Sequence, residues 1–444
     1  MNLIYGIKDK PKFGQMLLFA LQQVLAILAA TILVPAIIGN GMSQSAALFG
    51  AGVGTLVYQL FTKFRSPVFL GSSFAFINSM FAAFGGAASA SAGYAGILLG
   101  AIFAGLVYVV IAIIVKFVGV KWINKLMPPV VIVPTVALIG LSLAVNAVND
   151  LKVGKVLVDG VSACSPYVAL ICGIITLFAI FAFSAYGKGM MKLVPFVLGI
   201  VVGYSVASVF TVIGIATNNV ALQVINFAAF KEIQIFAVPD FTFVEAMKGV
   251  KEIDGAFIAT VAVAYVPVAF VVFAEHIADH KNLSTIIGSD LLEEPGLHRT
   301  LLGDGIGSFV GSIFGGCPNT TYGESVGCVA ITRNASVITI TTAAVMCIII
   351  SFFGPFVAFL DSSPGCVMGG VCVTLYGFIA VSGLKMIQKV DLNQNKNLFV
   401  VASILIPGIG GMAMGIGHVY VSNIACALIL GILVNLLVSR STDE

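Results

Sequence analysis

The chain has few charged residues and almost no tryptophan for its length of 444 residues. Asp, Glu, Lys and Arg make up 9% of it and there is one Trp, whereas 59% of the residues are hydrophobic. A soluble domain has about 25% charged residues, and a water-soluble protein with so little charge would expose apolar patches and aggregate. The net charge of +3 is also too small for a surface that follows nucleic-acid phosphates. These shortages exclude a soluble enzyme, a disordered chain and a nucleic-acid-binding protein.

Residues that bind metals or form disulfides are also sparse. The 8 Cys stand singly, mostly inside apolar runs, with no C-x-x-C or His-rich spacing. Such spacings are the signature of metal sites and disulfide frameworks. We therefore expect no metal, no cofactor and no disulfide, and we interpret the cysteines as small buried residues.

Long apolar runs, by contrast, fill the chain. About 20 such residues cross a bilayer as a helix, and fourteen candidate segments follow one another. The first is too long for the apolar region of a signal peptide and has no clear cleavage site, so we interpret it as a retained span. The segments are 14–38, 45–62, 68–85, 93–118, 126–148, 166–186, 192–216, 255–279, 300–316, 319–333, 336–360, 364–383, 396–416 and 419–439.

The basic residues orient these segments. Cytoplasmic loops of membrane proteins carry an excess of Lys and Arg. With both termini in the cytoplasm, most of the 22 basic residues fall inside, and the exceptions are Lys152, Lys155, Lys231, Lys248 and Lys251. The sequence thus predicts an even number of spans and a multi-pass protein of the inner (plasma) membrane with both termini cytoplasmic.

Segments 3 and 10 are short and interrupted. In 67–76 and 317–324, Pro, Gly, hydroxyl and β-branched residues suit extended backbone, and each stretch then turns into a helix. Paired broken segments in two halves mark the substrate site of transporters built as inverted repeats. We predict an all-α polytopic membrane protein of fourteen segments in two inverted seven-span repeats, with short strands in segments 3 and 10. The alternative is a pair of re-entrant loops without a ligand.

Segment 9 has a glycine at every fourth position. Gly303, Gly307, Gly311 and Gly315 form a smooth stripe on one helix face. Such a stripe lets another backbone approach closely. We predict a helix contact here, the alternative being a track for a sliding segment.

Four acids lie at or near membrane depth without a Lys or Arg close in sequence: Glu275, Asp279, Asp304 and Glu324. Because burying a carboxylate there costs about 2.5 kcal/mol or more, such acids tend to carry protons, cations or polar substrates. Glu275 and Asp279 share one helix face, and two carboxylates in a low dielectric do not both ionise easily. We therefore expect proton uptake and release in this group. The alternative is that backbone N–H and hydroxyl groups satisfy each acid.

Other residues near these acids divide into two sets. Glu324 follows Gly323 at the start of a half-helix, where N–H donors are free and the helix dipole is positive, and a second such start lies near Phe74. Carboxylates, backbone donors and an aromatic face fit a small planar molecule with N–H and C=O groups. We interpret His276 as a polar filler on another helix face and His280 as a residue of the cytoplasmic loop.

Three stretches, 274–279, 290–299 and 318–324, resemble the nucleobase–ascorbate transporters, a nucleobase–cation symporter family, and within it the bacterial uracil permeases. Gln22 and 71–76 match as well. The resemblance implies a core domain of segments 1–4 and 8–11, a gate domain of segments 5–7 and 12–14, and a homodimer formed through the gate domains. The implied parts are 1–125 and 255–362 (core), 126–217 and 363–444 (gate) and 218–254 (an extracytoplasmic connection).

The resemblance also implies roles for single residues. Glu275 and Glu324 would bind the N–H groups of a pyrimidine, Gly323 would give a backbone contact and Phe74 would pack on the ring. Tyr376 matches a tyrosine that faces the site from the gate domain.

Two residues depart from the family pattern. Asp279 stands where some uracil permeases have His, and Ser325 stands where the signature has Asn. Glu rather than Gln at position 324 resembles the uracil members, because a carboxylate accepts from N–H groups but donates only when protonated.

The expected function is import of uracil by proton symport through alternating access, with the proton on Glu275, Asp279, Glu324 or Asp304. The expected partners are the nucleobase and the lipid bilayer. The first alternative is a symporter for xanthine or another nucleobase, or one coupled to sodium through Asp304. A membrane-embedded enzyme or a channel is more distant, since no His or Cys ligand set accompanies the acids.

Overall fold

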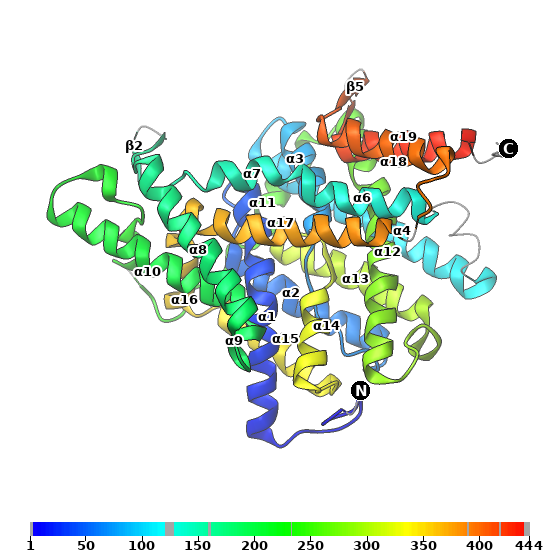
Figure 1. The fold of residues 1–444 in the computed structure, drawn as a ribbon, viewed down its shortest axis with the longest axis horizontal. Helices are drawn as coiled ribbons and strands as arrows, with labels where there is room; N and C mark the ends of the chain where they lie inside the picture. The colour runs from blue at the N-terminus through cyan, green and yellow to red at the C-terminus, as the bar shows by residue number, and fades with distance from the viewer. Residues whose placement is uncertain are drawn as a thin grey trace.

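The computed structural model describes residues 3–119, 128–158, 161–231, 233–388, 390–416 and 419–438, which are mostly helical (Figure 1). Seven of the described helices are long and apolar enough to cross a bilayer. A helix forms from such runs because it satisfies its own backbone N–H and C=O groups, as hydrocarbon surroundings require. The chain is a polytopic membrane protein.

The first half of the chain runs helix, helix, strand with half-helix, and then four more helical segments. Its elements are α1 (Phe13–Ile38), α2 (Gln44–Phe61), β1 (Leu70–Ser72), η1 (Phe74–Phe76), α3 (Ile77–Gly85), α4 (Ala90–Val118), α6 (Pro129–Ser142), α7 (Ala144–Asp150), β2 (Leu157–Val158), β3 (Val161–Ser162), α8 (Pro166–Tyr186), α9 (Met190–Leu193) and α10 (Pro195–Ala216).

The second half repeats this order after a connection of short helices. The connection holds η2 (Val220–Leu222), η3 (Phe227–Phe230), α11 (Thr242–Gly249) and η4 (Val250–Glu252). The repeated elements are α12 (Gly255–Ile287), η5 (Leu292–Gly296), α13 (Leu297–Gly315), β4 (Asn319–Thr321), α14 (Gly323–Thr332), α15 (Val337–Ser351), α16 (Gly354–Ser362), α17 (Gly365–Ile387), α18 (Asn395–Ile409), β5 (Met414–Ile416), β6 (Val419–Val421) and α19 (Asn423–Val438).

The two halves meet at a pair of short strands. β1 and β4 run antiparallel, with Leu70 opposite Thr321 and Ser72 opposite Asn319. An odd number of spans in each half turns the second half over relative to the first, and this is the inverted-repeat plan. The predicted fold class, with strands in segments 3 and 10, is confirmed.

Two segment boundaries differ from the sequence prediction. α12 continues past Asp279 to Ile287 and ends at Gly288, whose φ of 72° is left-handed, because no residue between them breaks a helix. His280 therefore lies inside α12 and its interpretation as a loop residue was wrong. The predicted segment 396–416 ends as a helix at Ile409, before Gly410 and Gly411, and the β5–β6 hairpin follows.

Helix packing brings the two halves together. α13 packs on α2 and α4, α12 packs on α3 and α4, and α15 packs on α1 and α2. Elsewhere α17 packs on α6 and α8, α10 packs on α8, and α18 packs on α19 and α6. The division into core and gate domains at the stated boundaries stays a prediction.

The glycine stripe of α13 lies directly on α2. A Cβ added at Gly307 would stand 2.6 Å from the carbonyl oxygen of Gly54, and one at Gly50 would stand 2.3 Å from that of Gly311. These approaches are too close for any side chain. The predicted helix contact is confirmed.

Candidate substrate-binding site

The site is built around the paired strands β1 and β4. Pro67 and Pro318 precede them and cannot donate the backbone hydrogen bonds of a helix, while Thr320 and Thr321 are β-branched and favour extended backbone. Extra bonds extend the pairing: Ser73 N donates to the Pro318 oxygen at 2.8 Å, and the Tyr322 hydroxyl donates to the Ser72 oxygen at 2.7 Å.

Each strand leads into a helix, and the starts of the two helices line the same cavity. η1 begins at Phe74 and runs into α3, and α14 begins at Gly323. The first N–H groups of a helix have no partner within it. Two sets of free donors therefore come from opposite halves of the chain to one place, where they face a cavity.

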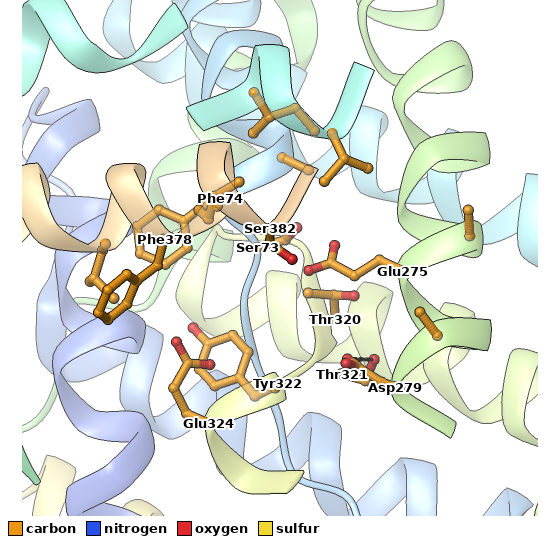
Figure 2. A pocket seen from close by; sticks show the side chains of 18 of the residues that line it. Ser73, Phe74, Glu275, Asp279, Thr320, Thr321, Tyr322, Glu324, Phe378 and Ser382 are labelled. Carbon is orange, nitrogen blue, oxygen red and sulfur yellow. Dashed lines mark hydrogen bonds between the residues drawn. The ribbon is translucent and has the colours of Figure 1, made fainter. Parts of the chain in front are cut away.

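That cavity has a volume of about 470 Å³. Its polar wall comes from α12, from β4 with α14, and from the turn before η1, as Figure 2 shows. Its apolar wall comes from α6, α10 and α17. The apolar lining residues include Ile132, Val136, Ile139, Phe196, Leu375, Phe378, Ile379 and Met386.

Three of the four predicted acids line this cavity. Glu275 and Asp279 enter it from α12 and Glu324 enters it from the first turn of α14 (Figure 2). The Thr321 hydroxyl donates to Asp279 Oδ2 at 2.8 Å. No Lys or Arg is among the lining residues. The cavity therefore presents several hydrogen-bond acceptors that can also take up protons.

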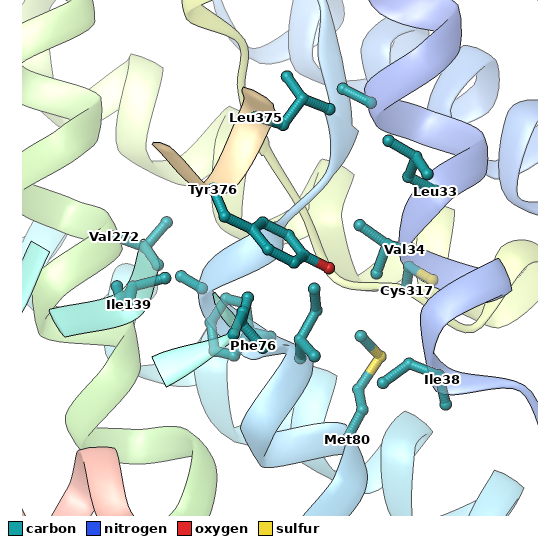
Figure 3. Close-up of a cluster of buried hydrophobic side chains, with 14 of the residues drawn as sticks. Leu33, Val34, Ile38, Phe76, Met80, Ile139, Val272, Cys317, Leu375 and Tyr376 are labelled. Carbon is teal, nitrogen blue, oxygen red and sulfur yellow. The ribbon is translucent and has the colours of Figure 1, made fainter. Parts of the chain in front are cut away.

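Phe74 and Gly323 also line the cavity, but Tyr376 does not. The Tyr376 side chain is buried and its ring meets the edge of Phe74, with 6.0 Å between the ring centroids. Tyr376 thus lies behind Phe74, in the apolar cluster of Figure 3, where its hydroxyl points toward Cys317.

Asp304 also lies outside the lining of this cavity. It is buried in α13, and its Oδ2 is 2.7 Å from Nδ1 of His276. The structure therefore brings together Phe74, Glu275, Asp279, Gly323 and Glu324, and it leaves out Asp304 and Tyr376.

Several lining residues were not predicted. The Ser73 and Thr320 hydroxyls are buried at the cavity and have no hydrogen-bond partner among the described residues. Their places beside Phe74 and Gly323 in the broken segments were a signal that could have found them. Ser382 lines the cavity from α17, and nothing in that ordinary apolar helix indicated it.

Ser325, which departs from the family pattern, is not among the lining residues. Its side chain is buried, and its hydroxyl oxygen accepts a hydrogen bond from Phe69 N at 3.2 Å. Gln23 Nε2 donates to the Ser325 carbonyl oxygen at 3.4 Å. Ser325 therefore ties α14 to the residue before β1 and to α1.

The cysteines are all buried and free, so their interpretation as small core residues is confirmed. Among the described residues, no three His, Cys, Asp or Glu side chains group as metal ligands.

A second cavity of about 500 Å³ borders the buried apolar cluster, part of which Figure 3 shows. The cluster includes Val34 of α1 and Tyr376 of α17. Pro35 and Met368, on neighbouring turns of the same helices, line the second cavity together with Asp150. One apolar layer thus stands between two hollows.

Comparison with known sequences gives long matches. The family model Xan_ur_permease, described as the permease family, matches residues 14–416. The uracil permease of Bacillus subtilis strain 168 is 36% identical over 452 residues, which cover 99% of this chain and 96% of that protein. The uracil permease of Bacillus caldolyticus is 38% identical over 438 residues (98% and 94%). The Escherichia coli K12 uracil permease is 32% identical over 429 residues (96% and 92%).

Solved structures match the fold at low sequence identity. The transmembrane domain of a cyanobacterial bicarbonate transporter, BicA, superposes with a TM-score of 0.63 at 14% identity, covering 98% of this chain and all of that one. SLC26A9 superposes with a TM-score of 0.66 at 12% identity, covering 97% of this chain and 66% of that one. At these identities the matches show a shared fold alone.

Proposed function

This chain belongs to the permease family and is therefore a transporter rather than an enzyme, and we propose that it imports uracil by proton symport. The observation that carries the proposal is the cavity that gathers Glu275, Asp279, Glu324 and Phe74 beside two helix starts. Uracil is flat and has two N–H donors and two C=O acceptors. Carboxylates, backbone N–H groups and an aromatic face complement each of these features, and relatives named uracil permeases support the choice.

Recognition of the base divides among five residues. Glu275 and Glu324 accept hydrogen bonds from the pyrimidine N–H groups, and such bonds to a charged acceptor contribute about 1.5–3 kcal/mol each. The Gly323 N–H, at the start of α14, donates to a carbonyl oxygen. Phe74 packs on the ring, and Tyr376 contributes by holding Phe74 from α17.

Proton coupling follows from the crowding of acids in one cavity. Glu275, Asp279 and Glu324 share a space that holds no Lys or Arg among its lining residues, so a proton on one of them lowers the repulsion among the rest. The proton lowers the negative charge of the site by one, and the N–H groups of uracil donate to the carboxylates that stay ionised. Loss of the proton on the cytoplasmic side restores the repulsion and weakens binding. Sodium in place of the proton is the alternative coupling ion.

Alternating access is supported by the two cavities and the apolar layer between them. Movement of α1–α4 and α12–α15 against α6–α10 and α17–α19 would close the substrate cavity and join the site to the second one. The excess of Lys and Arg in the loops assigned to the cytoplasm supports a cell-membrane protein with both termini in the cytoplasm. We also propose that two copies form a homodimer through the gate helices.

The test is uptake of labelled uracil by proteoliposomes under an imposed pH gradient, acid outside. Uracil should accumulate above its outside concentration and the accumulation should stop when the gradient is collapsed. Uptake that survives collapse but needs sodium would assign the coupling to sodium. Stronger competition by xanthine than by unlabelled uracil would overturn the choice of substrate.

A further inference from the structure

We propose that the buried pair His276–Asp304, extended by His280, is a positioning site that aims Glu275 and Asp279 at the substrate cavity, and that Asp304 keeps its protonation state during transport. The proposal rests on the proposed function of that cavity. It replaces the expectation that Asp304 carries the coupling proton or a sodium ion.

Two neighbouring faces of α12 carry matched pairs. Glu275 and Asp279 are four residues apart and line the cavity. His276 and His280 are also four residues apart. They lie on the neighbouring face of α12, outside the cavity lining, where both side chains are fully buried and their ring centroids are 4.0 Å apart. Because all four side chains stand on the same two turns of one rigid helix, whatever holds the histidines also sets the direction of the acids.

The hydrogen bonds of His276 define where its protons lie. We assign the Thr300 hydroxyl as the donor to the Leu297 carbonyl oxygen at 3.0 Å. In that assignment it accepts from His276 Nε2, which is 3.0 Å away. His276 Nε2 therefore carries a hydrogen. The remaining contact, 2.7 Å between Nδ1 and Asp304 Oδ2, then holds one shared proton, and the pair as a whole is neutral.

His280 extends the attachment to another helix. Its Nδ1 donates to the His276 carbonyl oxygen at 2.8 Å, and its Nε2 is 2.7 Å from the Tyr58 hydroxyl of α2. The Tyr58 hydroxyl is also 2.7 Å from Ser66 Oγ, in the stretch that leads into β1. The two histidines thus fasten α12 to α13, to α2 and to the approach of β1.

The surroundings separate Asp304 from the route of a transported proton. Asp304 is absent from the lining of the substrate cavity, and it faces a space of about 10 Å³ beside Tyr108, which is room for one water molecule at most. The titratable groups that face the pair are Tyr58 of α2, Tyr108 of α4, and the acids and His280 of α12. Glu275 and Asp279 line the substrate cavity themselves. Among the described residues, no hydrogen bond links them, or any other residue that lines the two larger cavities, to the His276–Asp304 pair.

The decisive comparison is Asp304→Asn against Asp304→Ala. An amide can donate to His276 Nδ1 and keeps the bond without a titrating proton, whereas Ala removes the bond. We expect Asp304→Asn to retain uracil KM, gradient-driven accumulation and the pH profile of uptake. We expect Asp304→Ala to raise KM and lower uptake by about tenfold or more, because Glu275 and Asp279 would lose the orientation in which they bind the base. Loss of gradient-driven accumulation in Asp304→Asn, with uracil exchange preserved, would make Asp304 a proton carrier and overturn the proposal.

A second pair of variants covers the case in which Asp304→Ala does not fold. Thr300→Val removes the acceptor of His276 Nε2 at nearly constant volume, and Thr300→Ser keeps it. We expect a raised KM in Thr300→Val and not in Thr300→Ser, at equal amounts of monodisperse protein. An unchanged KM in Thr300→Val and Asp304→Ala, with lower stability alone, would reduce the pair to a packing role and refute positioning.

The outcome is separable from that of the proposed function. Wild-type protein that takes up no uracil under any gradient refutes the proposed function. In that event, a nucleobase that raises the melting temperature of the wild type is chosen as the ligand, and the shift in melting temperature that it causes is measured for each variant. A ligand shift lost in Asp304→Ala but kept in Asp304→Asn would still support positioning, and equal shifts in both would overturn it.

Discussion

At the scale of single residues, the cavity depends on carboxylates that the bilayer would otherwise disfavour. Glu324 stands in the first turn of α14 beside Gly323, where the helix start offsets negative charge. Glu275 reaches the same space from α12. Each acid has a distinct direction, so each should bind a different edge of the base.

Glu324→Gln should weaken uracil binding by about tenfold or more, because a charge-assisted bond of about 1.5–3 kcal/mol is replaced by a neutral one. The measurement is KM for uptake together with the uracil-induced shift in melting temperature. Glu252→Gln makes the same chemical change at an exposed residue of the connection and should leave both unchanged. Equal uracil affinity in Glu324→Gln and wild type would remove Glu324 from the site.

Phe74→Ala should also raise KM, because the ring that faces the base and rests on Tyr376 is lost. Stacking on an aromatic face contributes about 0.5–1.5 kcal/mol beyond area burial, which corresponds to a change of about tenfold or less. Tyr376→Phe keeps the edge contact and removes only a hydroxyl without a partner among the described residues, so its KM should match wild type. A KM increase in Tyr376→Phe as large as in Phe74→Ala would assign that hydroxyl a direct contact with the base.

At the scale of elements, the close contact of α2 and α13 holds the two halves of the chain together. It exists because glycines face each other, with Gly307 against Gly54 and Gly311 against Gly50. In a membrane such small-residue faces drive helix association through packing. β1 follows α2 and β4 follows α13, so this contact also sets the distance between the two strands.

Gly307→Ala should destabilise the protein by about 1–3 kcal/mol, the usual cost of overpacking a tight interface, since its Cβ would meet the Gly54 carbonyl oxygen at 2.6 Å. Thermal unfolding of purified protein measures this. Gly377→Ala in α17, where a Cβ meets nothing within 4 Å, is the control and should unfold at the wild-type temperature. An equal melting temperature for Gly307→Ala would show that α2 and α13 separate at no cost.

At the scale of the whole molecule, an apolar layer lies between two cavities, and the proposed alternating access requires this layer to open. Cys317 lies in that layer at the start of β4 and is 1% exposed. In this conformation neither cavity is lined by it. Any conformation that joins the site to the second cavity has to part this layer and uncover the Cys317 thiol.

A variant with Cys317 as its sole cysteine should therefore react with a membrane-impermeant thiol reagent from the extracytoplasmic side during turnover. The rate should depend on uracil and on the pH gradient, because these drive the change of conformation. A variant with Cys347 as its sole cysteine is the control, since that thiol is buried within α15 and should stay unreactive. Equal rates for both thiols would contradict movement at this layer.

The features that depend on neighbours along the chain could be predicted from the sequence. Apolar runs defined most spans, Pro and Gly with β-branched residues defined the broken segments, and the four-residue spacing placed Glu275 and Asp279 on one face. These predictions hold because helix formation and bilayer insertion are decided by local composition. The end of α12 was missed, although it too is local, because a charged stretch after Asp279 was taken for a loop.

Contacts between side chains far apart in the sequence could be found only in the folded structure. The contact of His276 with Asp304 joins two helices, the burial of Tyr376 behind Phe74 joins α17 to η1, and Ser325 binds the backbone of Phe69. Buried polar groups have to find partners wherever the packing places them, and the partner's position depends on how α12, α13 and α17 cross rather than on sequence spacing. The same crossing angles put Ser382 in the cavity and leave Asp304 out of it.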